Sequence, residues 1–222
     1  RTGVPRNHRE HPRNTGAATD FNCTVGMYSR ALVEGLFGIV PNLLEGELLI
    51  RPGLPPEWES ASIDTPDVGY TYTREGDVER FEIRSRLKRP ASLRLRAAAR
   101  ASQVAGVTVN GQKAEWQCIP AVGEPVIEIL AQQADDANVE IRWKGHKPAS
   151  VECPKIVGLG EPLVARCGDA LVSEVRDPQE MLKEASCAAN ELRAIAAGRL
   201  GHRTAFARLE QDDLIWWAPL EV

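Results

Sequence analysis

The sequence predicts a mainly β protein: an antiparallel β-sandwich, preceded by the last helix of a helical barrel and followed by a small β-rich module. Short apolar runs recur between residues 46 and 147, with turn residues roughly every ten positions, a spacing typical of sandwiches. The 15 Pro and 18 Gly provide many turns. We therefore expect three units, at residues 1–45, 46–147 and 155–222.

One helix is predicted over residues 25–38, with Thr24 as its N-cap. Its apolar side chains occupy nearly every side, and a helix of this kind is normally buried in a larger body. They are Val25, Met27, Tyr28, Ala31, Leu32, Val33, Leu36 and Phe37. Pro41 is expected to end the helical pattern. We interpret this segment as the last helix of a domain whose earlier part precedes it.

The central unit contains a series of short strand patterns. They lie at 48–50, 63–72, 78–83, 93–96, 107–109, 114–118, 126–129 and 139–143. The dipeptide Asn110-Gly111 follows one of these runs, and it is the strongest short hairpin signal in the chain. These patterns predict an antiparallel sandwich.

The C-terminal unit follows a candidate linker at 144–154. Strands are expected at 163–165 and 171–175, and a hairpin at 204–217 turns around 211–213. Asp177-Pro178 reads as an N-cap and first helical position, which predicts one helix through Cys187. Residues 194–197 are ambiguous.

Composition excludes some function classes. The formal charge of −4 argues against a protein held to nucleic acid or an anionic membrane surface by bulk electrostatics. No apolar run approaches the roughly 18–20 residues of a membrane span. The chain opens at Arg1 without Met or an apolar signal segment, so we expect a piece of a longer protein.

No pattern in the chain indicates a metal or cofactor site. The five cysteines lack CxxC spacing, which favours buried free thiols, although a bridge between Cys153 and Cys167 remains open. His8 and His11 lie in a polar segment without helical pattern. No facing pair of carboxylates is evident: Asp20 and Glu34 would stand about 20 Å apart on a helix.

The five tryptophans are Trp58, Trp116, Trp143, Trp216 and Trp217. Structural roles are favoured, with Trp58 or Trp217 as the candidate sugar-stacking platform. Trp216 and Trp217 should point to opposite faces of one strand, so one of them is exposed or covered by another domain.

Residues 25–39 (VGMYSRALVEGLFGI) are followed by 48–55 (LLIRPGLP), Trp58 and the turn at 107–111 (VTVNG). This succession resembles the C-terminal region of bacterial glycoside hydrolases built on a six-hairpin helical barrel, with a rhamnosidase-like layout, and most closely an uncharacterised family. The resemblance covers about residues 15–145 and leaves 155–222 without a counterpart.

The resemblance implies an accessory portion of a carbohydrate-active enzyme that supports the catalytic barrel. The catalytic carboxylates of such enzymes lie earlier in the barrel, so no catalytic residue transfers to this chain. Arg13, Asn14, Asp20 and Asn22 would lie near the barrel mouth, where they could contact sugar hydroxyls. The implied partners are the barrel and an oligosaccharide or polysaccharide, and the implied location is periplasmic or extracellular.

Two other functions fit the same residues. A stand-alone carbohydrate-binding module would need an exposed planar aromatic side chain and measurable affinity for glycans. A ligand-free structural β-protein would show neither. The helix followed directly by a Pro-rich strand favours the enzyme interpretation.

Overall fold

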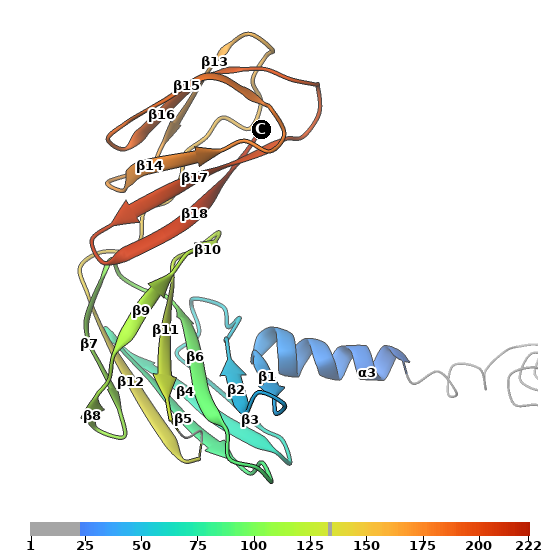
Figure 1. The fold of residues 1–222 in the computed structure, drawn as a ribbon, viewed down its shortest axis with the longest axis vertical. Helices are drawn as coiled ribbons and strands as arrows, with labels where there is room; N and C mark the ends of the chain where they lie inside the picture. Colours follow the sequence, from blue (N-terminus) through green and yellow to red (C-terminus); the bar gives the residue numbers. More distant parts are fainter. Residues whose placement is uncertain (1–22, 133–134) are drawn as a thin grey trace, which may run out of the picture.

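The computed structural model describes residues 23–132 and 135–222. A helix, α3 (Cys23–Arg30), continues into a π-helical segment, η1 (Ala31–Leu36), and every later element is a strand. Two sandwich-like units are stacked along the long axis of the molecule, and the helix projects sideways from the first (Figure 1). The prediction of a mainly β protein with antiparallel sheets is confirmed.

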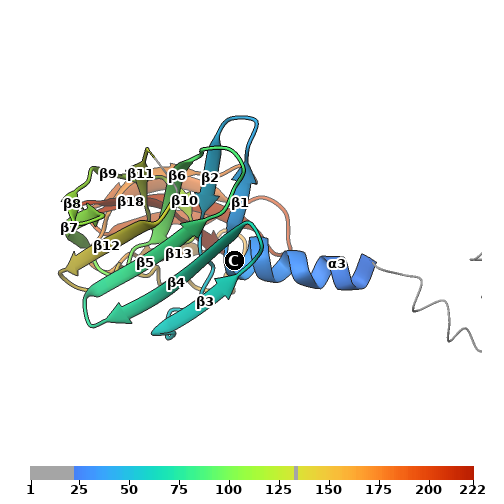
Figure 2. The ribbon, with the colours of Figure 1, turned by 90° about the horizontal axis from the view of Figure 1, so that it is seen from below.

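The first unit packs two sheets face to face (Figure 2). One sheet has the order β1-β2-β6-β11-β9, formed by β1 (Ile39–Asn42), β2 (Glu47–Ile50), β6 (Ser92–Ala98), β9 (Trp116–Ile119) and β11 (Val126–Ala131). The other has the order β3-β4-β5-β12-β7-β8, formed by β3 (Ser60–Asp64), β4 (Val68–Glu75), β5 (Val78–Ser85), β7 (Gln103–Val109), β8 (Gln112–Lys113) and β12 (Ala137–Lys144).

Strand alternation positions the core of this unit. In β6, Leu93 and Leu95 are buried, while Arg94 and Arg96, which alternate with them, face outward. All pairings in the first unit are antiparallel except that of β2 with β6, which is parallel. The chain can make this pairing because β3, β4 and β5 lie between the two strands in sequence and form the other sheet.

The hairpin predicted at Asn110-Gly111 is confirmed. Val109 of β7 pairs with Gln112 of β8, so the loop contains two residues. Both have positive φ, 51° for Asn110 and 77° for Gly111, as a type I′ turn requires.

The second unit also contains two sheets. One has the order β10-β18-β17-β14, formed by β10 (Ala121–Val122), β14 (Leu171–Arg176), β17 (Thr204–Gln211) and β18 (Leu214–Glu221). The other has the order β13-β16-β15, formed by β13 (Pro162–Arg166), β15 (Leu182–Ala188) and β16 (Glu191–Ala196). The expected strands at 163–165 and 171–175 and the hairpin around 211–213 are confirmed.

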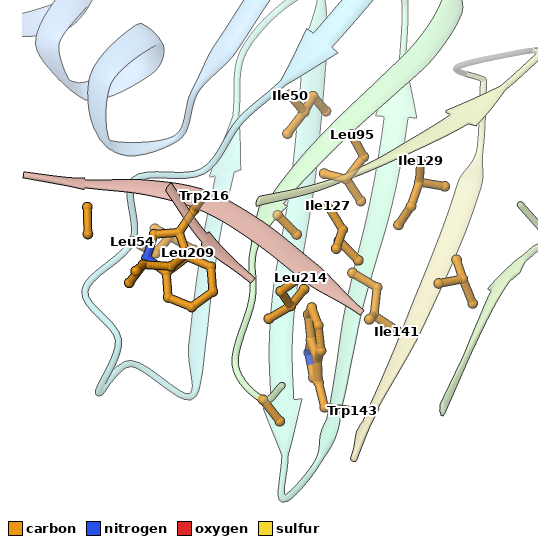
Figure 3. Close-up of a cluster of buried hydrophobic side chains, with 14 of the residues drawn as sticks. Ile50, Leu54, Leu95, Ile127, Ile129, Ile141, Trp143, Leu209, Leu214 and Trp216 are labelled. Atoms are coloured by element: carbon orange, nitrogen blue, oxygen red, sulfur yellow. The ribbon is translucent and has the colours of Figure 1, made fainter. Parts of the chain in front are cut away.

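The two units share a core and a strand. β10 leaves the first unit and pairs in parallel with β18 of the second. Buried side chains of both units form one cluster, which includes Leu54 of the first unit and Leu209 and Trp216 of the second (Figure 3). At the junction between the two units, the backbone N–H of Ile215 in β18 donates to Cys118 Sγ of β9 at 3.1 Å. The junction is therefore a packed interface.

The helix predicted from Asp177 to Cys187 is wrong, because residues 182–188 form β15. Asp177 does cap a turn: its carboxylate accepts the backbone N–H of Leu182 at 2.7 Å. Glu180 and Glu184 then have φ of 53°, which a right-handed helix does not allow. Pairing with β16 overrides the local Asp-Pro signal.

The N-terminal helix differs from the prediction in two ways. Helical backbone ends at Leu36, two residues early, and Pro41 lies inside β1. Proline is tolerated there because β1 is an edge strand. Residues 26–31 are exposed to solvent, so within the described chain this helix is not the buried element that its composition predicts.

Candidate functional site

The C-terminal end of the helix is fixed to the first sandwich. The backbone N–H of Gly53 donates to the Leu36 carbonyl at 3.0 Å. Tyr70, buried on β4, donates its hydroxyl to the Phe37 carbonyl at 2.8 Å, and the two rings meet edge to face at 5.8 Å. These contacts hold the helix at a fixed angle to the sheets.

Gly38 makes the close approach possible. Its φ is +67°, and a Cβ at this position would lie 1.9 Å from the Arg51 carbonyl oxygen. The backbone N–H of Arg51 donates to the Gly38 carbonyl at 3.0 Å. The chain therefore needs glycine between the helix and β1.

The N-terminal part of the helix projects away from the sandwich (Figures 1 and 2). Met27 is 64% exposed and Tyr28 is 67% exposed. Leu44, in the turn between β1 and β2, is 95% exposed. Two large apolar side chains exposed at adjacent helix positions, Met27 and Tyr28, favour contact with another protein surface. We call the exposed residues 26–31 of the helix the projecting face.

A hollow of about 240 Å³ lies beside the point where the helix is attached. Its lining includes the loop at 52–56, which follows β2, together with Tyr72, Arg100 and Glu124. Gly53 of this loop also holds the end of the helix. The hollow and the helix are thus attached to the same loop.

Glu79 forms one wall of this hollow and is 1% exposed. One carboxylate oxygen, Oε1, accepts the Tyr72 hydroxyl at 2.7 Å and Arg100 Nε at 2.9 Å. The other, Oε2, accepts Trp143 Nε1 at 2.8 Å. Three donors, one of them the Arg100 cation, therefore satisfy the hydrogen-bonding capacity of this buried carboxylate.

The pKa values of its partners follow from this environment. Burial, together with the hydrogen bond and charge of Glu79, raises the pKa of Tyr72 to about 12. Burial works to lower the pKa of Arg100, but the hydrogen bond and charge of Glu79 outweigh burial and raise it. At neutral pH these groups keep their protons, so the network serves as a rigid support.

A second hollow, of about 560 Å³, lies next along the surface. It is lined by Val122 of β10, Phe206 of β17, Trp217 of β18 and the turn at 176–178. Val122 is 65% exposed. Because Glu124 lines the first hollow and Val122 the second, the two hollows border the same short segment of chain.

The tryptophans predicted on opposite faces of β18 take those positions. Trp216 is 1% exposed in the core, whereas Trp217 lies on the outer face. The Arg176 guanidinium carbon stands 4.4 Å from the centroid of a Trp217 ring, a cation–π contact that occupies one face of the indole. Trp58 is 39% exposed, so it is the more exposed of the two tryptophans considered as sugar-stacking platforms.

Arg13, Asn14, Asp20 and Asn22, which the resemblance places near a barrel mouth, lie outside the described residues. Sequence reasoning missed Glu79 and Arg100. A signal was present, since Glu79 falls in phase with the core positions Phe81 and Ile83 along β5.

The cysteines partly follow expectation. Cys118, Cys153 and Cys167 are free and half-buried or buried, and burial raises the pKa of Cys167 to about 11. Cys187 is also free but exposed, so the expectation of a buried thiol is wrong there.

Within residues 23–132 and 135–222, no three His, Cys, Asp or Glu side chains are grouped in a way that could hold a metal ion.

Neither helical segment in the described part of the chain is long and apolar enough to cross a membrane. Comparisons with protein-family models, with curated proteins and with solved structures found no match to this chain.

Proposed function

We propose that this chain is the C-terminal accessory portion of a carbohydrate-active enzyme, a glycoside hydrolase, and that it supports a helical catalytic domain. One observation carries the proposal: the helix is fixed to the sandwich at Phe37 and Gly38, while Met27 and Tyr28 are left exposed. A helix attached rigidly at one end and apolar at the other is suited to join two packed bodies.

The first hollow, beside the attached end of the helix, supports the same role. The loop at 52–56 lies between the helix and the first hollow, and the buried Glu79–Arg100 pair stiffens the wall behind it. Rigid surfaces lose less conformational entropy when they dock. The sandwich would brace the helical domain, and the substrate would be an oligosaccharide or polysaccharide held by that domain. Export from the cell stays a prediction of the sequence resemblance.

The experiment is immunodepletion of an extract of the source organism with an antibody raised against this chain. We expect depletion to remove hydrolysis of one substrate in a panel of aryl glycosides. Depletion with pre-immune serum is the control. Unchanged hydrolysis of every glycoside would overturn the proposal.

A variant tests the role of the helix in the native polypeptide. Met27→Asp with Tyr28→Asp places charges on the projecting face, so we expect loss of glycoside hydrolysis and a less stable helical domain. Glu57→Gln, on the exposed loop before Trp58, is the matched control. If the double variant keeps full activity and stability, the helix does not join the two bodies.

A further inference from the structure

The second unit contains an apolar pocket that the proposed function does not use. Its volume is about 360 Å³, within the range of about 300–1,000 Å³ that holds small-molecule ligands. Its floor is formed by core side chains, Leu163 of β13, Met181 and Ala196 of β16, which are at most 6% exposed. The pocket therefore opens directly onto the hydrophobic core.

The lip of this pocket is also apolar. Ile156 is 91% exposed, Leu200 is 83% exposed and Leu159 is 51% exposed. They come from two loops, the one before β13 and the one between β16 and β17. Side chains of this kind lose contact with water when an apolar ligand fills the space between them.

The charged side chains that line the pocket all carry one sign. Lys155, Arg199 and Arg203 line it, with His202 beside them, and no Asp or Glu belongs to the lining. None of the four forms an ion pair with the described residues. The nearby Glu161 does not line the pocket, and its carboxylate accepts the Gly158 backbone N–H at 3.0 Å. In a chain of net charge −4, this local excess of positive charge stands out.

We propose that this pocket binds a single-chain amphiphile with an anionic head group, a fatty-acid carboxylate. The alkyl chain lies along Leu163 and Met181 and between the apolar lip residues, while the carboxylate is held by Lys155 and Arg199. Apolar lining with a few polar groups that fix orientation is the usual composition of a small-molecule site. This inference does not rest on the proposed glycoside hydrolase role.

Calorimetry with octanoate, decanoate and dodecanoate, each below its micelle concentration, tests the apolar part of the pocket. We expect saturable binding at one site per chain. Each pair of added methylenes should tighten Kd roughly tenfold until the pocket is filled. Absence of saturable binding, or affinity independent of chain length, would overturn the proposal.

Comparison with dodecyltrimethylammonium tests the charged part. We expect dodecanoate to bind at least about tenfold more tightly, and Lys155→Glu with Arg199→Glu to reverse this preference. Lys88→Glu, an exposed change in the first sandwich, should leave the preference intact. Equal binding of both head groups to the unaltered chain would contradict the assignment.

A pocket-filling variant separates specific binding from adsorption to the exposed lip. Ala197→Leu adds volume at the half-buried lining position beside Met181, whose carbonyl accepts the Ala197 N–H at 2.8 Å. We expect dodecanoate to bind at least about tenfold more weakly, with an unchanged circular dichroism spectrum. Undiminished binding would place the ligand elsewhere; if Ala197→Leu unfolds, the charge-reversal pair still decides the proposal.

Discussion

The hydroxyl of Tyr70 donates a hydrogen bond of 2.8 Å to the carbonyl of Phe37, across 33 positions of sequence. Phe37 follows the last turn of the helix, and Tyr70 is buried in the sheet that faces β1 and β2. This contact fixes the direction in which the helix leaves the sandwich. The position of the projecting face therefore depends in part on one side chain of β4.

Tyr70→Phe should loosen this attachment while keeping the aromatic packing. We expect the free energy of unfolding to fall by about 1 kcal/mol, because a partly buried carbonyl loses its donor. Amide hydrogen exchange in residues 31–37 should become faster. Tyr28→Phe, on the exposed helix, is the control and should change neither urea unfolding nor exchange.

Gly38→Ala should be far more damaging than the same change at another glycine of positive φ. The new Cβ would lie 1.9 Å from the Arg51 carbonyl oxygen, so the backbone must shift. We expect a loss of about 3 kcal/mol in urea unfolding. Gly76→Ala, with φ of +58° and nothing within 4 Å of the added Cβ, should cost about 1 kcal/mol. Similar losses at the two sites would contradict the close approach.

Glu79→Leu should leave Arg100 without its carboxylate partner. Since the Arg100 side chain is 21% exposed and water can reach part of it, we expect a loss of about 2–3 kcal/mol in urea unfolding. Trp143 fluorescence should also change, because its indole N–H loses an acceptor. Adding Arg100→Met should recover part of the loss, and failure to recover any would argue against direct coupling. Glu75→Gln, at a carboxylate 76% exposed, is the control.

Glu128 should make the stability of the first unit depend on pH. Burial acts to raise the pKa of this carboxyl, but hydrogen bonds from Arg96, Gln117 and Arg94 outweigh burial and hold the pKa below its usual value of 4.5. Its contribution is therefore present above pH 4.5 and is lost as pH falls through the lowered pKa.

Glu128→Gln should remove this contribution. We expect the variant to be less stable at pH 7 and to show a smaller loss of stability between about pH 5 and pH 3. Urea unfolding across this range measures both. An acid dependence identical to that of the unaltered chain would mean that Glu128 does not contribute to it.

Some elements were predictable because local chemistry decides them. Asn110-Gly111 tolerates positive φ at both positions, so the hairpin followed from two residues. Leu93 and Leu95 alternate with arginines, which defines the buried face of β6. At these positions the local conformational preference, the hydrophobic pattern and the tertiary contacts all favour the same structure.

Other elements depend on distant residues. Asp177-Pro178 signals a helix locally, but pairing of β15 with β16 makes the following segment a strand. Glu79 is in phase with the buried positions of β5, but its partners come from other elements: Arg100 from the turn after β6 and Trp143 from β12. The pocket near Arg199 likewise joins two loops separated by four strands.

We propose that the projecting helix joins this chain to a catalytic helical domain. The most direct measurement is the intact mass of the native polypeptide, isolated from the source organism with an antibody to this chain, together with its glycoside hydrolysis. We expect the isolated polypeptide to be considerably larger than 24.3 kDa and to hydrolyse an aryl glycoside. A folded, monomeric and inactive chain of 222 residues, with Met27 and Tyr28 exposed in solution, would contradict it.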